Sequence, residues 1–375
     1  MADPSLSLGV EEEYLLVDPE TFDLVPAPDG LFDACADALG DQVTPEFLQC
    51  QLEVGTAVCA DVAAVRDDLA RLRGTVAAVA DRFGVVPIAA STHPFAEWGR
   101  QVFTDRARYR DLEADLAGVA RRMLICGMHV HVGVEDEDQR IDLLNQVSYF
   151  LPHLLALSAS SPFWEGTETG LSCYRLTVFD NMPRTGLPPR LGSFAEYRRS
   201  VDTFVRCGVM EDATKLWWDL RPSDKYPTLE ARICDVVPRI DDAVAIVAVI
   251  QSLFAMLHDL HQRNQRWRIY DRFLIDENRW RAQRYGVEGT MIDFGRGESA
   301  PFGALMEELV DLLRPHADAL GCLPEVERAL GIARDGSSAT RQVAAYRAAM
   351  DGGADEGAAL RAVVRDLAAE FTEGV

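Results

Sequence analysis

The sequence predicts an α+β protein in which an antiparallel β-sheet packs one of its faces against helices. Five stretches alternate apolar and polar residues, as strands of a sheet with one buried face do. The turn over 222–227 predicts that the last two of these stretches form an antiparallel hairpin. From Ile240 onward the apolar spacing is that of helices. No repeat or low-complexity linker divides the 375 residues, so we expect one domain over 1–375.

The expected elements follow from local signals. Asp61 caps a helix that stops at Gly84, and Ser193 caps a helix that extends to about residue 207. Pro152 is expected to kink a helix over 137–160. Strands are expected over 9–17, 47–55, 85–91, 123–134, 171–179, 216–221 and 228–234, and further helices over 31–39, 104–122, 241–264, 279–285, 300–320 and in two segments from 338 to the C-terminus.

The five alternating strands share an unusual polar face. In the first strand Glu11 and Glu13 lie on one side about 7 Å apart, from a rise of ~3.4 Å per residue, and such carboxylates repel each other unless a cation compensates them. A solvated acidic edge strand would explain one such pair, but the pattern recurs. Over the five strands the polar face holds Glu11, Glu13, Gln49, Gln51, Glu53, His129, His131, Asp219, Arg221, Glu230 and Arg232.

This set of side chains predicts a metal site beside a site for anions. Carboxylates with one or two imidazoles suit Mg²⁺ or Mn²⁺, and nearby arginines suit phosphate or carboxylate oxygens. Together they indicate metal-assisted phosphoryl transfer. Taken singly, the two histidines fit a surface pair, and Glu230 with Arg232 fits a structural ion pair. Glu12 shares the apolar face, so we expect it to be structural.

Composition excludes several classes of protein. The net charge of -23 argues against nucleic acids and anionic membranes as partners. Lys215 and Lys225 are the only lysines and neither follows a glycine, which excludes a P-loop. Eight cysteines without a Cys-x-x-Cys pair argue against a zinc ribbon and for a reducing compartment. The apolar window 243–257 is too short to span a bilayer and the N-terminus lacks a signal-peptide pattern, so we expect a cytoplasmic protein.

A dinucleotide-binding interpretation starts from Gly295-Arg-Gly297-Glu-Ser-Ala300. This segment matches the Gly-x-Gly-x-x-Ala fingerprint and precedes an expected helix. No strand is expected after that helix, so the βαβ context is missing. We therefore expect no NAD(P) site.

Several motifs along the chain carry a resemblance to a known family. They are Gly9-Val-Glu-Glu-Glu13, Cys126-Gly-Met-His-Val-His-Val-Gly133, Arg175, Pro183-Arg-Thr-Gly-Leu-Pro188, Trp217-Trp-Asp-Leu-Arg-Pro222, Thr228-Leu-Glu-Ala-Arg-Ile-Cys-Asp235 and Asn278-Arg-Trp-Arg-Ala-Gln-Arg-Tyr-Gly286. These motifs resemble the glutamate–cysteine ligase type 2 family, and more narrowly its YbdK-type carboxylate–amine ligases, within the glutamine-synthetase-like superfamily. The resemblance covers nearly the whole chain.

The resemblance implies a glutamine-synthetase-like fold, in which the antiparallel sheet curves into a funnel or half-barrel with helices on its outer face. ATP would enter one end and the amino-acid substrate the other, with two or three Mg²⁺ ions between them. Gln49 and Gln51 stand where other members have acidic residues, which leaves the number of metal ions open. The implied metal ligands are Glu11, Glu13, Glu53, His129 and Glu230; the implied nucleotide contacts are His131, Arg221 and Arg175; and the implied catalytic residues are Arg232 and Glu230.

The function expected from the residues and the resemblance is that of an ATP-dependent carboxylate–amine ligase. Such an enzyme phosphorylates a carboxylate, here the γ-carboxylate of glutamate or a similar acid, and an amine such as cysteine then attacks the acyl phosphate. A γ-glutamyl amide, ADP and phosphate would be released. The alternative is a non-catalytic module that binds a metal or an amino acid on a degenerate ligase scaffold. All expected partners are small molecules, and a homodimer is one assembly open to the chain.

Overall fold

A long central strand, β1 (Leu8–Val17), organises the sheet. The computed structural model describes residues 3–375, without the side chains of 108 and 111–113. Within this part of the chain, β1 pairs antiparallel with β3 along one edge and with β5 and β4 along the other. The sheet has seven strands in the order β10-β11-β5-β1-β3-β2, with β4 beside the second half of β1. These strands are β2 (Val43–Pro45), β3 (Gln51–Gly55), β4 (Val86–Ile88), β5 (Met128–Gly133), β10 (Leu220–Pro222) and β11 (Thr228–Ala231).

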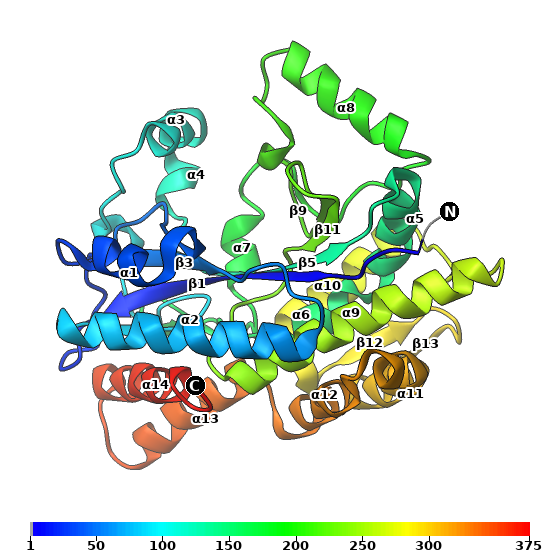
Figure 1. The fold of residues 1–375 in the computed structure, drawn as a ribbon. Coiled ribbons are helices and arrows are strands. Elements are labelled where there is room, and N and C mark those ends of the chain that lie inside the picture. The colour runs from blue at the N-terminus through cyan, green and yellow to red at the C-terminus, as the bar shows by residue number, and fades with distance from the viewer. Residues whose placement is uncertain (1–2) are drawn as a thin grey trace.

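The two faces of the sheet meet different surroundings. Tyr14 packs its ring edge-on against Phe371 of the last helix, at 4.9 Å between centroids, so the even-numbered side chains of β1 face the helical layer. Figure 1 shows this layer, with α2, α9 and the C-terminal helices, on one side of β1, while α3, α4 and α8 stand on the other side. The odd-numbered side chains, Glu11 and Glu13 among them, therefore point away from the helical layer. The predicted assignment of faces in β1 is confirmed.

The helices account for most of the remaining chain. The helix caps predicted at Asp61 and Ser193 are confirmed, because their side chains accept hydrogen bonds from the backbone N–H groups of Ala64 and Glu196. The α-helices are α1 (Leu31–Leu39), α2 (Val62–Arg82), α3 (Ala107–Leu116), α4 (Gly118–Arg121), α5 (Glu137–Val147), α6 (Leu151–Ser158), α7 (Arg175–Phe179), α8 (Phe194–Arg206), α9 (Ile240–Gln262), α10 (Arg272–Tyr285), α11 (Phe302–Leu320), α12 (Leu323–Asp335), α13 (Ser338–Asp351) and α14 (Glu356–Phe371).

Short strands and 3₁₀ turns complete the secondary structure. The expected helix over 137–160 is interrupted by a 3₁₀ turn, and Pro152 lies in the first turn of α6, where its missing N–H costs nothing. The short strands are β6 (Phe163–Trp164), β7 (Thr167–Glu168), β8 (Thr185–Gly186), β9 (Trp217–Trp218), β12 (Thr290–Asp293) and β13 (Glu298–Pro301), and the 3₁₀ turns are η1 (Gly40–Gln42), η2 (Trp98–Arg100), η3 (Ser148–Phe150), η4 (Ala213–Lys215) and η5 (Gly286–Glu288).

The apolar helix α9 lies in the core. It is the one described helix whose length and composition would allow it to cross a membrane, but 89% of its most apolar window is buried inside the protein. One hydrophobic cluster, which runs from Leu8 to Phe371, connects the sheet, α9 and the C-terminal helices. A smaller cluster lies around Tyr197 of α8. The α+β class with an antiparallel sheet is confirmed, whereas the single domain over 1–375 stays a prediction.

Other predicted elements also differ in the structure. The stretch 171–179 is not a strand: its second half forms α7, and the N–H of Arg175 donates to Ser161 Oγ at the start of this helix. The expected helix over 104–122 breaks at Ala117, which has a φ of 49°. The strand expected from residue 47 begins only at Gln51, because residues 46–50 form an irregular connection. At α7, a hydrogen bond to a distant segment accompanies the departure from the local strand pattern.

The candidate dinucleotide fingerprint lies in a β-hairpin. β12 and β13 pair antiparallel, with Asp293 opposite Glu298, and Gly295 and Gly297 belong to the turn between them. Gly297 has a φ of 72°, in the left-handed region that favours glycine. A hairpin places no helix N-terminus behind the glycines, and so the segment lacks the geometry that binds a pyrophosphate.

The buried Glu12 forms a structural ion pair, as its position on the apolar face predicts. Its carboxylate accepts hydrogen bonds from Arg73 Nη2 at 2.6 Å, from Arg73 Nε at 2.9 Å and from the Tyr14 hydroxyl at 2.5 Å. The side chains of Glu12 and Arg73 are both fully buried. This pair joins β1 to α2 beneath the polar face.

Candidate active site

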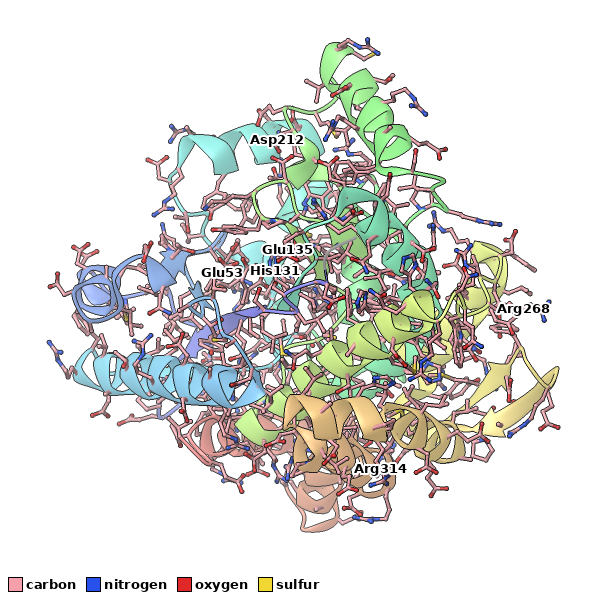
Figure 2. The ribbon with its side chains drawn as sticks, turned by 45° about the vertical axis from the view of Figure 1, so that its right-hand side comes forward. Glu53, His131, Glu135, Asp212, Arg268 and Arg314 are labelled. Atoms are coloured by element: carbon pink, nitrogen blue, oxygen red, sulfur yellow. The ribbon has the colours of Figure 1, made fainter. Side chains whose placement is uncertain are left out.

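Most of the polar residues predicted from alternation meet on one face of five adjacent strands. Glu13 of β1 lies opposite Glu53 of β3, and Glu11 lies opposite His129 of β5. The next neighbours across the sheet continue the row, with His131 opposite Glu230 and Glu230 opposite Arg221. Glu53 and His131, labelled in Figure 2, lie near the middle of the molecule. The sheet register therefore brings together side chains that are up to 219 positions apart, from Glu11 to Glu230.

One group of possible metal ligands consists of Glu11, His131 and Glu230. One ligand atom from each lies within 4.8 Å of the other two. Glu11 Oε1 is 3.7 Å from His131 Nε2, and His131 Nδ1 is 3.0 Å from Thr228 Oγ1. The hydroxyl thus orients the imidazole so that its other nitrogen faces Glu11.

A second group consists of three carboxylates, those of Glu13, Glu46 and Glu53. Their oxygens also lie within 4.8 Å of one another. Burial, and then the charge of Glu46, raise the pKa of Glu13 to about 8, although Arg175, the N–H of Gly127 and Arg232 act in the opposite direction. Burial and the charges of Glu46, Glu11 and Glu13 likewise raise the pKa of Glu53 well above its usual value. Three carboxylates this close retain protons unless a cation compensates their charge.

Glu46 is a site residue that sequence reasoning missed. Even-numbered residues of a continuous strand over 47–55 would share the apolar face with Leu48 and Leu52, and so alternation assigned no site residue before Gln49. The irregular connection between β2 and β3 removes that constraint, and Glu46 turns toward Glu53. One signal for Glu46 was available: it is an acidic residue that comes immediately before a predicted strand, and two of its neighbours across the sheet are acidic.

Two arginines surround the carboxylate of Glu230. Arg221 Nε donates to Glu230 Oε2 at 2.8 Å, and its Nη1 donates to the carbonyls of Thr214 and Leu216, both at 2.8 Å. Arg232 also donates to Glu230 through Nη1. Burial would raise the pKa of Glu230, but the charges of Arg232 and Arg221 outweigh it and hold the pKa well below the usual range. Glu230 is therefore a carboxylate at neutral pH.

Arg232 has donor capacity that its protein contacts do not use. Its side chain is 11% exposed, and its Nε is buried without a hydrogen-bond partner among the residues that the structure describes. Buried donors are normally paired, and a ligand oxygen is one kind of partner that would complete this one. The charge and the planar donors of Arg232 make it suited to phosphoryl or carboxylate oxygens.

His129 lies between Glu11 and Arg232. Its Nδ1 is 3.1 Å from Glu11 Oε2 and 3.5 Å from Arg232 Nη1. Burial, and then the charge of Arg232, lower the pKa of His129 to about 4. Burial would raise the pKa of Glu11, but hydrogen bonds and charge from His129 and His131 outweigh it and lower that pKa. A neutral imidazole and an ionised carboxylate are the forms that bind metal ions.

The remaining predicted residues lie around this site with different surroundings. Gln51 donates to the carbonyl of Ile125 at 2.8 Å, and Gln49 donates to that of Phe103 at 3.1 Å, so neither supplies a carboxylate to the metal groups. Asp219 is buried and binds Arg279 at 2.6 Å rather than facing the carboxylates. Arg175 is 2% exposed and donates to backbone carbonyls at the end of β11. Its contact with a nucleotide stays a prediction.

The two groups fit hard divalent cations. Their donors are mainly carboxylate oxygens, which Mg²⁺ and Mn²⁺ prefer, and neither group includes a cysteine. The raised pKa values of Glu13 and Glu53 reflect burial and the charge of neighbouring carboxylates, which the nearby arginines offset only in part. The geometry thus suits one cation in each group, with Arg221 and Arg232 next to the group that contains Glu230.

Comparison with other proteins agrees with this site and fold. The family model described as glutamate–cysteine ligase family 2 matches residues 7–365. A relative from Jannaschia sp. (strain CCS1), whose provisional name is glutamate–cysteine ligase 2, is 57% identical over 370 residues, which cover 99% of this chain and 98% of the relative. A relative from Paracoccus denitrificans (strain Pd 1222) with the same provisional name is 55% identical and covers 98% of both chains.

Solved structures share the fold at low sequence identity. A bifunctional glutathione synthetase from Pasteurella multocida superposes with a TM-score of 0.69 at 16% identity; the match covers 98% of this chain and 53% of that longer protein. A glutamate–cysteine ligase from Francisella tularensis, solved in complex with AMP, superposes with a TM-score of 0.67 at 13% identity, over 98% of this chain and 89% of the other. These likenesses confirm the glutamine-synthetase-like fold. The match of the family model over nearly the whole chain, together with relatives above 50% identity, shows that the chain belongs to glutamate–cysteine ligase family 2, a family of ATP-dependent carbon–nitrogen ligases.

Proposed function

We propose that this protein is an ATP-dependent ligase that joins a carboxylate, glutamate or a similar acid, to an amine through an acyl phosphate. The observation that carries the proposal is the presence of two groups of possible cation ligands at one face of the sheet, with Arg221 and Arg232 beside Glu230. Membership in a ligase family supports it, as do the AMP in one structural neighbour and the names of the relatives. The substrates are small molecules, and the predictions of no nucleic acid, no membrane, a homodimer and a cytoplasmic location rest on the sequence alone.

The cation sites in this proposal use the residues of both groups. Glu13, Glu46 and Glu53 hold one Mg²⁺ or Mn²⁺ ion, and Glu11 and Glu230 hold another with an imidazole as third ligand. His131 lies within that group, whereas His129 contacts Glu11. Metal binding by the variants His129→Asn and His131→Asn distinguishes which imidazole is the third ligand. When bound, these ions neutralise the phosphate oxygens of ATP, which would otherwise repel a carboxylate.

The chain's own side chains orient the phosphoryl group and the acid. Arg232 offers its guanidinium to the phosphoryl group in transfer, and Glu230 keeps that guanidinium in place. Arg221, tied to Glu230 and to two carbonyls, adds positive charge, and the predicted nucleotide contacts of His131 and Arg221 belong to the same proposal. The acid needs no general base in this step, because a carboxylate is ionised at pH 7.

The ligase reaction then proceeds in two balanced steps. In the first, a carboxylate oxygen of the acid attacks the γ-phosphorus of ATP, the bond to the bridging oxygen breaks, and ADP leaves. In the second, the amine attacks the acyl carbon, loses a proton and expels phosphate. One oxygen of the original carboxylate therefore leaves with the phosphate.

A screen of acids and amines for ADP release tests the activity. Purified protein with Mg²⁺ and ATP is incubated with pairs of amino acids and amines, and amide product is identified by mass. We expect turnover only with an acid and an amine together. If ATP is never consumed while metal ions or amino acids bind, the non-catalytic module replaces the ligase.

Isotope labelling tests the intermediate. With ¹⁸O in the carboxylate of the acid, we expect one label in each phosphate released during ligation. Unlabelled phosphate would rule out the acyl phosphate, and AMP formation would direct attention to an acyl adenylate.

A further inference from the structure

Arg232 lies just beyond the end of its strand. β11 ends at Ala231, whose partner in β10 is Leu220, so the backbone of Arg232 is outside the regular ladder of the hairpin. A catalytic guanidinium needs a fixed backbone, because a displacement of about 1 Å can cost roughly 10²-fold in rate. Groups other than the β-ladder must therefore hold this backbone.

On its carbonyl side, Arg232 is held by Arg175. Arg175 Nη2 donates to the carbonyl of Arg232 at 3.1 Å, and Nη1 donates to that of Ile233 at 3.3 Å. Asp235, 3.9 Å from Nη1, supplies the countercharge. Asp235 itself accepts from the N–H of Ser160 and the hydroxyl of Ser161, both at 2.8 Å. The guanidinium of Arg175 is thus locked at a buried position behind the site.

Gly127 makes room for this guanidinium. A Cβ at position 127 would lie 2.4 Å from Arg175 Nη2 and 3.0 Å from its Cζ. The N–H of Gly127 also donates to Glu13 Oε2 at 2.7 Å. One residue without a side chain therefore lies between a proposed metal ligand and the arginine that holds Arg232.

On its N–H side, Arg232 is held by a second buried network. Its N–H donates to the carbonyl of Asp219 at 2.8 Å. The carboxylate of Asp219 binds Arg279 Nε at 2.6 Å, and Arg279 Nη1 also binds Asp180 at 2.7 Å. These contacts fix the peptide of Arg232 from α10 and from the end of α7.

We propose that Arg175 is a positioning residue, which acts on the reaction by holding the backbone of Arg232 rather than by touching the nucleotide. The proposal rests on the proposed ligase function. It is carried by the juxtaposition of a buried guanidinium, two carbonyls at the end of β11 and the bare Cα of Gly127. Its contacts leave Arg175 enclosed, with 2% of the residue exposed.

A double-variant cycle tests this role. Arg175→Lys keeps the charge opposite Asp235 but cannot donate to two carbonyls with one planar group. We expect a turnover rate about 10–100-fold below the parent, as for other residues that orient a reactive one. In a protein that already carries Arg232→Lys, adding Arg175→Lys should lower the turnover rate by no more than about threefold, because Arg175 acts on the reaction by positioning Arg232.

Two measurements distinguish failure of this proposal from failure of the proposed ligase function. The screen described above first establishes turnover of the parent. The cycle is then measured both in turnover and in the dissociation constant of Mg²⁺ with a non-hydrolysable ATP analogue, which requires no reaction. An effect of Arg175→Lys that persists undiminished in the Arg232→Lys background, in either readout, means that Arg175 acts independently and overturns the proposal. Turnover at the parent rate in folded Arg175→Lys would overturn it as well.

A second variant and a matched control complete the test. Gly127→Ala, which pushes the guanidinium aside without removing a charge, should lower turnover in the same direction; a folded variant with the parent rate would contradict the proposal. Arg73 is the control, because it also joins a buried carboxylate to backbone carbonyls, those of Val237 and Pro238, but on the apolar face. Arg73→Lys should lower the melting temperature with little change in turnover. An equal loss of turnover would show that the position of Arg175 has no special role.

Discussion

At the scale of single residues, the charge state of three carboxylates determines what the site can bind. Glu13, Glu46 and Glu53 lie together in a buried place, and two of them have raised pKa values because burial and mutual repulsion disfavour their ionised forms. Glu11 and Glu230 have lowered pKa values, because histidines and arginines oppose their desolvation. The pKa values of Glu13 and Glu53 thus stay raised despite the arginines nearby, whereas Arg221 and Arg232 keep Glu230 ionised.

The first prediction concerns Glu13. Glu13→Gln removes one negative charge from the group with Glu46 and Glu53 while it keeps the shape of the side chain. We expect weaker Mg²⁺ binding, seen as a higher Mg²⁺ concentration for half-maximal turnover and for half-maximal change in calorimetry. Glu12→Gln, one position along the same strand but on the other face, is the matched control. An unchanged Mg²⁺ requirement in Glu13→Gln would remove Glu13 from the ligands.

The second prediction concerns Arg232. Arg232→Lys keeps the charge but loses the planar donors, and the loss of one preorganised contact to a developing charge typically costs roughly 10²–10³ in rate. We expect a drop of that order in turnover with a melting temperature near that of the parent. Steady-state ADP release and a thermal melt measure the two effects. A drop below tenfold would mean that Arg232 does not contact the phosphoryl group in transfer.

At the scale of elements, β1 separates stability from chemistry through its alternation. Glu11 and Glu13 face the site, while Glu12 between them is fully buried against Arg73 and Tyr14. Because successive side chains of a strand point to opposite faces, a slip of one residue would bury the metal ligands and expose Tyr14. The Glu12–Arg73 pair ties β1 to α2 and so opposes such a slip.

The third prediction follows from this division. Glu12→Gln leaves Arg73 with a reduced countercharge in a fully buried place, and disruption of one partner of a buried pair typically costs about 3–5 kcal/mol. We expect a clearly lower melting temperature and a turnover rate per folded molecule within a few-fold of the parent. Circular dichroism and ADP release on the same sample measure both. A large loss of rate without a change in melting would instead place Glu12 at the chemistry.

At the scale of the whole molecule, a net charge of -23 and a cluster of carboxylates lead us to expect that stability depends on cations. A carboxyl group with a raised pKa binds its proton more tightly in the folded than in the unfolded chain. Its contribution to the free energy of unfolding is therefore largest below its unfolded pKa and is lost as pH rises through its folded pKa. For Glu13 that range runs from its ordinary value of 4.5 to about 8.

The fourth prediction is a pH-dependent stabilisation by metal ions. Without divalent cations, the melting temperature should fall as the pH rises from 7 to about 8, the folded pKa of Glu13. In this range the lowered pKa of His129, at about 4, no longer affects stability. Mg²⁺ should reduce this fall, so the increase in melting temperature that it causes should grow with pH. Scanning fluorimetry with EDTA or Mg²⁺ measures both curves, and Glu13→Gln should flatten the EDTA curve. A Mg²⁺ effect that shrinks toward pH 9 would show that these carboxylates are not its binding site.

Some features of this protein are determined by the sequence alone. Alternation in 9–17, 123–134 and 228–234 predicted which side chains share a face, and the register of β1, β5 and β11 confirms it. A period of two is a property of the extended chain itself, and the polar residues at that period had to occupy one side of the sheet. The caps at Asp61 and Ser193 are equally local, since each involves an N–H only three residues away.

Other features were decided only by the tertiary structure, because they depend on groups that are distant in the chain. Glu46 joins the carboxylates through an irregular connection that interrupts alternation, and α7 forms where local pattern favoured a strand. Arg175 binds the end of β11, 57 positions further along the chain, where no local signal could place it. Contacts of this kind are fixed by the packing of elements against one another, and so local periodicity carries no information about them.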